Sequence, residues 1–277
     1  MRFPIPNDQI PTWVLLIIHT FFFSTSKSDP RISEAGQFCG NTAHPSGSNF
    51  VPNFIDTMES ISNHVNDKQW GNYTITSPAP KLYALAQCHA DLSPKDCSTC
   101  FAISRTKLPT CLPSTSARIY LDGCFLSYDD HDFSSQALDD ERKVVKCGRP
   151  IDVSKDKYMQ QGFCLKVRNV IGNVTEKAVS HQGFAVTGVE GVYALAQCWR
   201  TISKKGCKEC LEEAGKNLRG CLPGKQSRAM LAGCYFRYST ERFYDIEQEE
   251  EENHFGEAHI NIHLELKLFL VRSLIEF

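Results

Sequence analysis

The chain carries one cysteine pattern twice, and this repeat restricts its fold more than any other feature of the sequence. Five cysteines of the first copy recur 110 residues later in the second copy. The motif Tyr-Ala-Leu-Ala-Gln-Cys accompanies them unchanged, at residues 83–88 and 193–198. Two related modules of about 100 residues are therefore predicted, in place of one large domain. The recurring cysteines are Cys88, Cys97, Cys100, Cys111 and Cys124, followed by Cys198, Cys207, Cys210, Cys221 and Cys234.

A sixth cysteine completes each copy. Cys39 stands in a Phe-Cys-Gly sequence, and Cys147, in Lys-Cys-Gly, is its counterpart because it lies close to the expected offset. Twelve of the 13 cysteines thus form two sets of six, and Cys164 is left over. Six cysteines can pair in many ways, and the spacing alone does not choose between them.

The N-terminal segment indicates where the protein is made and what becomes of its cysteines. An apolar run from Trp13 to Phe23, followed by small polar residues, is typical of a signal peptide, here over residues 1–26. A secreted chain passes through an oxidising compartment, so disulfides are the expected state of its thiols. In a secreted chain, the sequons at Asn72 and Asn173 are expected to be glycosylated.

The repeat also sets the expected domain boundaries. A first module is predicted over residues 33–136, a second over 140–246, and a poorly ordered tail, acidic and then apolar, over 247–277. Charged residues at 265, 267 and 272 interrupt the apolar part of the tail, so it is not expected to span a membrane.

Each copy has the same pattern of secondary-structure signals. Apolar residues recur at helical spacing after the first cysteine of each copy, and a second helix is expected to begin after Ser93-Pro94, where serine supplies the cap. Residues 83–88 and 117–128 are typical of strands. The predicted fold class is α+β: two tandem disulfide-rich modules, each with two helices packed on an antiparallel sheet. The expected core faces of the first helices are Phe54, Met58, Ile61 and Val65, and Met159, Phe163, Val167, Val170 and Val174.

The doubled six-cysteine register resembles the plant cysteine-rich secretory repeat, also called the ginkbilobin-homologous domain. Tandem copies of it form the ectodomains of cysteine-rich receptor-like kinases, and the chain is similar to such an ectodomain without membrane span and kinase. The resemblance covers roughly residues 33 to 246. The disulfides it implies are Cys39–Cys111, Cys88–Cys97 and Cys100–Cys124 in the first copy, and Cys147–Cys221, Cys198–Cys207 and Cys210–Cys234 in the second.

The sequence offers little support for catalysis. The pairs Cys97/Cys100 and Cys207/Cys210 match the Cys-x-x-Cys redox motif, but each of these cysteines has another partner in the implied disulfide pattern. Histidines are not grouped with acids at ligand spacing, so we expect no metal and no cofactor. A net charge of -2 argues against a nucleic-acid partner. We expect no enzyme, and a thiol oxidoreductase is the distant alternative.

The resemblance implies one candidate carbohydrate site. In the antifungal lectin that gives the domain its name, mannose is held by an Asn after the first cysteine, an Arg before the last and a Glu after it. Arg118 and Arg228 match the Arg, and Asp129 stands at the acidic position of the first copy. Glycine follows both first cysteines, with Asn41 one step further on, and the second copy has Ser239 in place of an acid. These departures put a mannose site in doubt.

Charge and the leftover cysteine suggest how partners could bind. Residues 39–133 hold 6 basic and 9 acidic residues, whereas residues 147–245 hold 16 basic and 9 acidic residues. The second module is therefore the expected docking surface for an anionic partner, a cell-wall glycan or another extracellular domain. Cys164 flanks the predicted core face of its helix, which favours a buried, inert thiol over an intermolecular disulfide.

The function that these features favour is recognition or signalling by a non-enzymatic protein secreted to the apoplast, in the context of plant defence. It would resemble a soluble receptor-kinase ectodomain. A mannose-type lectin with antifungal activity is the alternative.

Overall fold

The computed structural model describes residues 29, 31–152 and 157–245, and these residues form two modules with the same order of elements. The signal peptide and the tail from 247 onward lie outside the described residues. The first module contains β1 (Glu34–Cys39), α2 (Phe50–Lys68), β2 (Trp70–Ile75), β3 (Leu82–Cys88), α3 (Pro94–Lys107), the 3-10 helix η1 (Leu108–Cys111), β4 (Ala117–Leu121) and β5 (Cys124–Asp129). The second contains β6 (Val144–Cys147), α4 (Lys157–Ser180), β7 (Phe184–Val189), β8 (Val192–Cys198), α5 (Lys204–Gly220), β9 (Gln226–Met230) and β10 (Cys234–Ser239).

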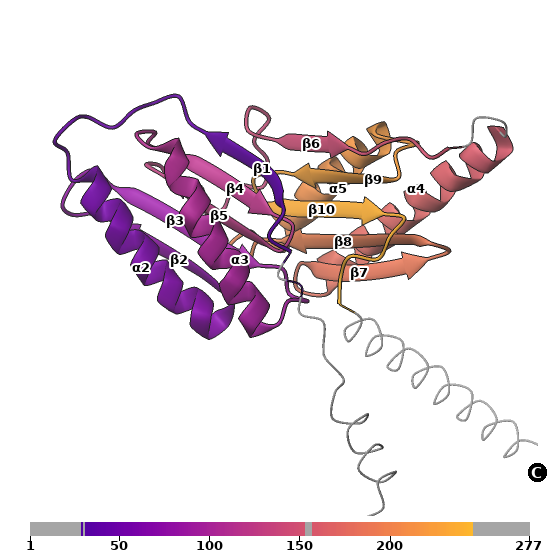
Figure 1. The fold of residues 1–277 in the computed structure, drawn as a ribbon, viewed down its shortest axis with the longest axis horizontal. Coiled ribbons are helices and arrows are strands. Elements are labelled where there is room, and N and C mark those ends of the chain that lie inside the picture. The colour runs from indigo at the N-terminus through magenta and orange to yellow at the C-terminus, as the bar shows by residue number, and fades with distance from the viewer. Residues whose placement is uncertain (1–28, 30, 153–156, 246–277) are drawn as a thin grey trace, which may run out of the picture.

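Both modules have the same sheet topology. The first sheet has the strand order β1-β4-β5-β3-β2 and the second has the order β6-β9-β10-β8-β7, with every pair antiparallel. Two helices cover one face of each sheet, and in Figure 1 the helices of the first module lie in front of their sheet while those of the second lie behind theirs. The predicted α+β class, with two helices on an antiparallel sheet in each module, is confirmed.

The first helices pack much as their apolar spacing predicts. Phe54, Met58, Ile61 and Val65 of α2 are all buried, together with Phe50 one turn earlier. Their spacing keeps them on one face of the helix, where they meet the sheet. The predicted core face of the first module is confirmed.

The beginning of α4 differs from the prediction. Val167, Val170 and Val174 are buried, but Met159 is 65% exposed and Phe163 is only partly buried. Figure 1 shows the first turns of α4 projecting past the ends of the strands, so no sheet covers them. Cys164 belongs to this region and is a free thiol, as predicted, but it is half-buried rather than buried.

Serine caps fix the starts of the second helices. The Ser93 hydroxyl accepts a hydrogen bond from the Asp96 amide of α3 at 3.1 Å, and Ser203 does the same for Gly206 of α5 at 3.1 Å. Each cap satisfies one amide that the helix itself cannot pair. The capped helix then presents two cysteines, Cys97 and Cys100 in α3, to the sheet. The sequence-predicted cap of the first of these helices is confirmed.

The structure forms six disulfides, three in each module and none between them. Their pairs are those that the resemblance implies: Cys39–Cys111, Cys88–Cys97, Cys100–Cys124, Cys147–Cys221, Cys198–Cys207 and Cys210–Cys234. In the first module they join β1 to η1, β3 to α3 and α3 to β5. Each cysteine of the two Cys-x-x-Cys motifs is therefore bonded to a residue outside its own motif.

Removing one of these bonds gives a direct test of their contribution. We expect the double variant Cys100→Ala/Cys124→Ala to lower the free energy of unfolding by about 3–5 kcal/mol, because the bond closes a 24-residue separation between two buried positions. Denaturant unfolding measures this loss, with Cys164→Ser as a control that removes a thiol but no bond. Peptide mapping without reductant should recover all six pairs. A mapped Cys164–Cys221 bond would contradict the register.

Candidate functional site

A third hydrophobic cluster lies between the modules and joins them. It combines the sheet faces that the helices leave uncovered, so each central strand has both faces buried. In β5, for example, Leu126 packs into the core of its own module while Phe125 packs against the second module. The connector between the modules, residues 134–146, is short and charged, which predicts side-by-side packing. This cluster shows that the sheets themselves meet. Its fully covered members include Leu85, Tyr120, Phe125, Leu195, Trp199, Met230 and Tyr235.

Trp199 lies within this cluster. Its ring stacks on Phe125 with a centroid distance of 4.5 Å, and its indole N–H donates to the Ala232 carbonyl at 2.8 Å. The Tyr120 hydroxyl donates in the same way to the Leu231 carbonyl at 3.0 Å, and burial raises the Tyr120 pKa to about 12. Both rings thus bury a large apolar area while their polar atoms stay paired.

The glutamine of the duplicated motif in each module forms hydrogen bonds with the backbone of the other module. The side-chain Oε1 atom of Gln87 accepts from the backbone N–H of Arg200 in the second module at 2.8 Å, and Oε1 of Gln197 accepts from the backbone N–H of Ala90 in the first at 3.1 Å. The side-chain amide of Gln87 also donates, through Nε2, to the backbone carbonyl of Cys198 at 3.2 Å. Because Arg200 stands 110 residues after Ala90, the two contacts are equivalent, and the repeated motif encodes a pseudo-symmetric interface.

Asp122 is the centre of a charged network across the interface. Its carboxylate accepts from the Arg228 Nε and Nη2 atoms at 2.6 and 2.8 Å and from the Tyr235 hydroxyl at 2.9 Å, and it lies 3.2 Å from Arg237 Nη1. Burial alone would raise the Asp122 pKa, but the hydrogen bond from Arg228 and the charges of both arginines outweigh it and lower the pKa. Arg228 is therefore engaged in joining the modules.

Arg118, the corresponding residue of the first module, is also enclosed. It is 1% exposed, and its guanidinium donates to Gln136 Oε1 at 2.9 Å and lies 3.3 Å from a carboxylate oxygen of Asp139. Both partners belong to the segment between β5 and β6, which crosses this part of the sheet. The Arg118 side chain is thus occupied by the chain itself.

Asp129 belongs to the same group of charges. Its carboxylate accepts from Arg142 Nη1 at 2.7 Å, and Arg142 Nε lies 3.5 Å from Asp139. Arg118, Asp139, Arg142 and Asp129 therefore form a row of alternating charge. Arg118 pairs across the sheet with Ser127, two residues before Asp129, so the structure does bring both predicted residues to one face of the sheet. Asn41 is exposed, two residues beyond the end of β1.

The other predicted residues have simpler positions. Asn72, in β2, and Asn173, in α4, are both exposed, as a glycosylated asparagine must be. Asp129, Asp130 and His131 place potential ligand atoms within 4.8 Å of one another. The Asp129 carboxylate in this group already pairs with Arg142, so the cluster gives no reason to revise the expectation of no metal site.

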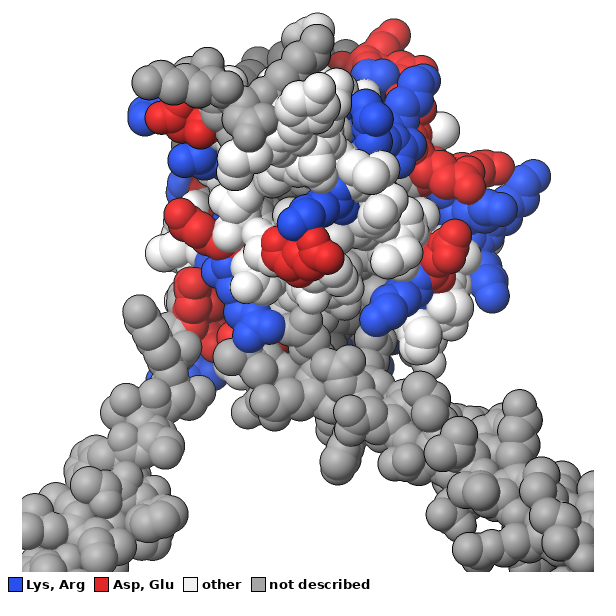
Figure 2. All heavy atoms as spheres, turned by 90° about the vertical axis from the view of Figure 1, so that its right-hand side faces the viewer, with Lys and Arg blue, Asp and Glu red and all other residues white. Residues whose placement is uncertain are grey.

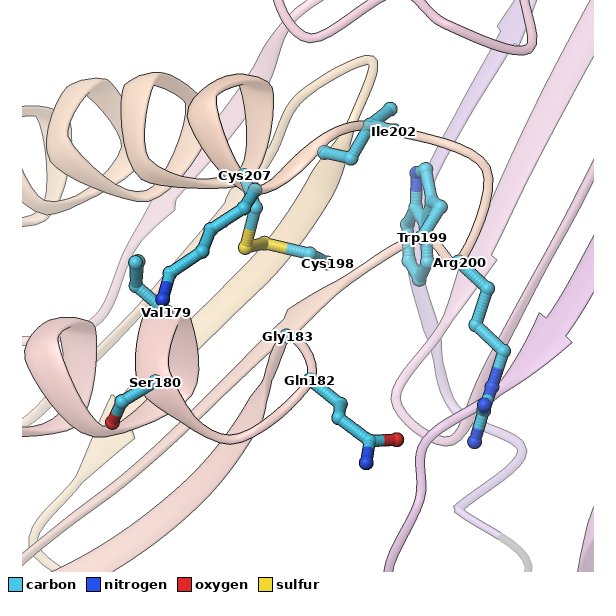
Figure 3. Close-up of a pocket in the computed structure, with 10 residues that line it drawn as sticks. Val179, Ser180, Gln182, Gly183, Cys198, Trp199, Arg200, Ile202 and Cys207 are labelled. Carbon is cyan, nitrogen blue, oxygen red and sulfur yellow. A yellow bond between two sulfur atoms is a disulfide. The ribbon is translucent and has the colours of Figure 1, made fainter.

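A pocket of about 400 Å3 lies beside the Cys198–Cys207 disulfide, between the end of α4 and the start of α5 (Figure 3). The Trp199 ring and the Gln182 and Arg200 side chains border its other side, where Gln182 and Arg200 point the same way. The disulfide consumes both sulfur atoms and Trp199 is 2% exposed, so the pocket has neither a thiolate nor an open aromatic face. None of the residues predicted for a carbohydrate site lines it.

Among the described residues, no helix combines the length and the apolarity that a membrane crossing needs. The described part of the chain is thus a pair of disulfide-bonded α+β modules that share a buried interface.

Comparison with known proteins identifies this class of module. Residues 38–131 and 146–241 both match the family described as Salt stress response/antifungal, so the chain belongs to that family and contains it twice. The resemblance to the ginkbilobin-homologous repeat is thereby confirmed.

Two curated relatives show the range of the family. The chain is 40% identical to cysteine-rich receptor-like protein kinase 42 of Arabidopsis thaliana over 83% of its length, but it spans only 35% of that kinase. It is 27% identical to the antimicrobial ginkbilobin-2-like protein of Castanea crenata, covering 75% of this chain and 88% of that one.

A solved structure gives the same fold. The tandem DUF26 ectodomain of the cysteine-rich receptor-like protein PDLP5 of Arabidopsis thaliana matches with a TM-score of 0.62 at 24% identity. The match covers 75% of this chain and 98% of that ectodomain. This chain and that ectodomain therefore share a fold of two α+β modules arranged in tandem.

The short connector predicts that the modules pack side by side, but the residues of their interface, which make most of the buried polar contacts described above, were not predicted from the sequence. The sequence feature that indicates such an interface is a strand with apolar residues on both of its faces. Residues 124–128, Cys-Phe-Leu-Ser-Tyr, have no purely polar face, and such runs are typical of strands buried on both sides.

Proposed function

We propose that this chain is a secreted, non-enzymatic recognition protein of the plant apoplast, comparable to a soluble ectodomain of a cysteine-rich receptor-like kinase and acting in signalling or defence. The observation that carries the proposal is the buried interface, which makes the two modules one body. A rigid body of this kind can present a fixed outer surface to a partner at low entropic cost. Its twelve bonded cysteines suit an oxidising compartment.

The mannose-lectin alternative receives less support from the geometry. A sugar needs polar groups that are open to it, and Arg118 is 1% exposed while Arg228 is bound to Asp122. We therefore expect no saturable mannose binding by the full chain in calorimetric titration. Mannose binding that Arg118→Ala abolishes, in a variant that still unfolds cooperatively, would establish the lectin alternative instead.

Secretion and partner binding can be tested on the full chain. Expressed in leaf cells, it should be recovered from apoplastic fluid, and deglycosylation should shift its mass unless both Asn72→Gln and Asn173→Gln are present. Pairwise screening against purified plant extracellular domains should then find a saturable partner that Arg118→Ala does not weaken. Retention inside the cell, or turnover of a thiol substrate such as insulin, would contradict the proposal.

A further inference from the structure

A second pocket, of about 280 Å3, lies where β6 and β10 end and β9 begins. Four basic residues line it, Arg149, Lys225, Arg237 and Arg242, against one acidic residue, Glu241. Figure 2 views this end of the second module and shows several groups of Lys and Arg side chains among the acidic ones. The basic excess of the second module is thus partly gathered into one cavity.

Backbone hydrogen bonds build this pocket from three separate segments. The Lys225 amide donates to the Arg149 carbonyl at 2.7 Å, and the Thr240 amide donates to the Lys225 carbonyl at 2.9 Å. These bonds hold Arg149 and Lys225 side by side, although like charges repel each other. Within the described part of the chain, neither residue has an ion-pair partner. A bound anion would remove this repulsion.

The floor of the pocket adds further positive charge. Arg237 has a side chain that is 12% exposed, its guanidinium lies 4.0 Å from the centre of the Phe243 ring, and its Nε atom is buried without a hydrogen-bond partner. Among the described residues its acidic contact is Asp122, which it shares with Arg228. Two partly buried guanidinium groups thus face the Asp122 carboxylate, and the excess charge lies beneath the pocket.

The first module does not have this charge at the equivalent place. Counted from the cysteine register, the positions of Lys225, Arg237 and Arg242 hold Thr115, Ser127 and Asp132 in the first copy. Arg149, the second residue after Cys147, likewise corresponds to Asn41 after Cys39. Four positions are therefore basic in one copy and neutral or acidic in the other. Asp122 pairs with Arg237, and Arg242 lies over the Tyr193 and Tyr244 rings, so contacts within the fold accompany these two basic residues. Among the described residues no such contact accompanies Arg149 and Lys225, so the difference at these two positions points to binding.

We propose that this pocket binds a carboxylated sugar, specifically a uronic-acid unit of an acidic glycan. Four cations suit a carboxylate, while Gln226, Ser239 and Thr240 place amide and hydroxyl groups beside them for the sugar hydroxyls. This combination distinguishes a uronic acid from a purely acidic peptide. Only the source of the glycan rests on the proposed extracellular role, and the chemistry of the pocket does not.

Titration of the full chain with an α-1,4-linked tetramer of galacturonic acid tests the pocket. We expect saturable binding that added salt weakens and that the methyl-esterified tetramer does not show. The double variant Arg149→Ala/Lys225→Ala should weaken binding about tenfold or more, because two charge-assisted contacts are lost. Lys205→Ala is the matched control, since that lysine is 88% exposed on α5 and does not line the pocket.

The contrary outcomes are distinct. Equal loss in the pocket and control variants would show non-specific attraction, and tighter binding of a tetraglutamate peptide would identify a protein ligand; either result overturns the proposal. To exclude competition for the pocket by the acidic run 247–252 of the same chain, the titration is repeated with the glutamates of that run replaced by glutamine. No binding by either form of the chain would also overturn it. Binding of purified protein does not depend on secretion, so failure here and failure of the proposed function are separable.

Discussion

Replacing Asp122 with alanine is expected to lower the free energy of unfolding by about 3 kcal/mol, because the change leaves two partly buried guanidinium groups without their counter-charge. Arg228 loses a bidentate partner, Arg237 loses its ion pair, and the Tyr235 hydroxyl loses its acceptor. All of these contacts run between the modules, so the variant should weaken the interface more than either core. Denaturant unfolding followed by tryptophan fluorescence measures the loss.

The contribution of Asp122 should also depend on pH. The pKa of this carboxyl is lowered in the folded protein, so its stabilising effect is fully present above the ordinary aspartate pKa of about 4. It is lost as the pH falls through the folded-state pKa. The stability difference between the wild-type chain and Asp122→Asn should therefore be constant above about pH 5 and shrink below about pH 4.

A surface aspartate provides the control for both measurements. Asp140 pairs with Lys143 across an exposed contact, and its side chain is 87% exposed. Asp140→Ala should leave unfolding unchanged. If Asp122→Ala were as mild as this control, the charged network would not be holding the modules together.

Replacing Trp199 with alanine has a similarly large expected effect, about 3–5 kcal/mol. The substitution removes the ring that stacks on Phe125 and leaves the Ala232 carbonyl without its indole donor. The resulting cavity lies between two sheets that their disulfides and helices hold in place, so it cannot collapse easily. Thermal unfolding should show a lower midpoint for this variant.

Leu165 supplies the comparison for Trp199. It is 58% exposed on α4, and Leu165→Ala should change the stability by less than about 0.5 kcal/mol. A Trp199→Ala protein as stable as the Leu165→Ala protein would mean that the interface adds little to the fold. The two substitutions also separate interface packing from general loss of apolar surface.

The modules could be predicted from the sequence because their signals are local or repeated. The cysteine offset identifies two copies, and the spacing of Phe54, Met58 and Ile61 identifies a helix face whichever surface it packs against. The start of α4 could not be predicted in this way. Met159 continues the apolar spacing, but the sheet ends before it reaches that turn.

The candidate site was predicted only in part, because position in sequence does not reveal what covers a side chain. The resemblance located Arg118, Arg228 and Asp129, and the structure gives each of them an internal partner. Those partners, Asp122 and the segment between the modules, carry no recognisable motif. The basic pocket could be anticipated from the excess charge of the second module, but its location depends on backbone contacts between three distant segments.

The central claim is that the two modules form one body through a shared interface, to which the arginine of the second carbohydrate motif contributes. Differential scanning calorimetry of the full chain, with its disulfides intact, tests this claim most directly. We expect one transition whose calorimetric and van't Hoff enthalpies agree, and a lower midpoint without loss of the fold in Trp199→Ala. Two separable transitions in the wild-type chain, unchanged by Asp122→Ala and Trp199→Ala, would show that the modules unfold independently and would contradict the account.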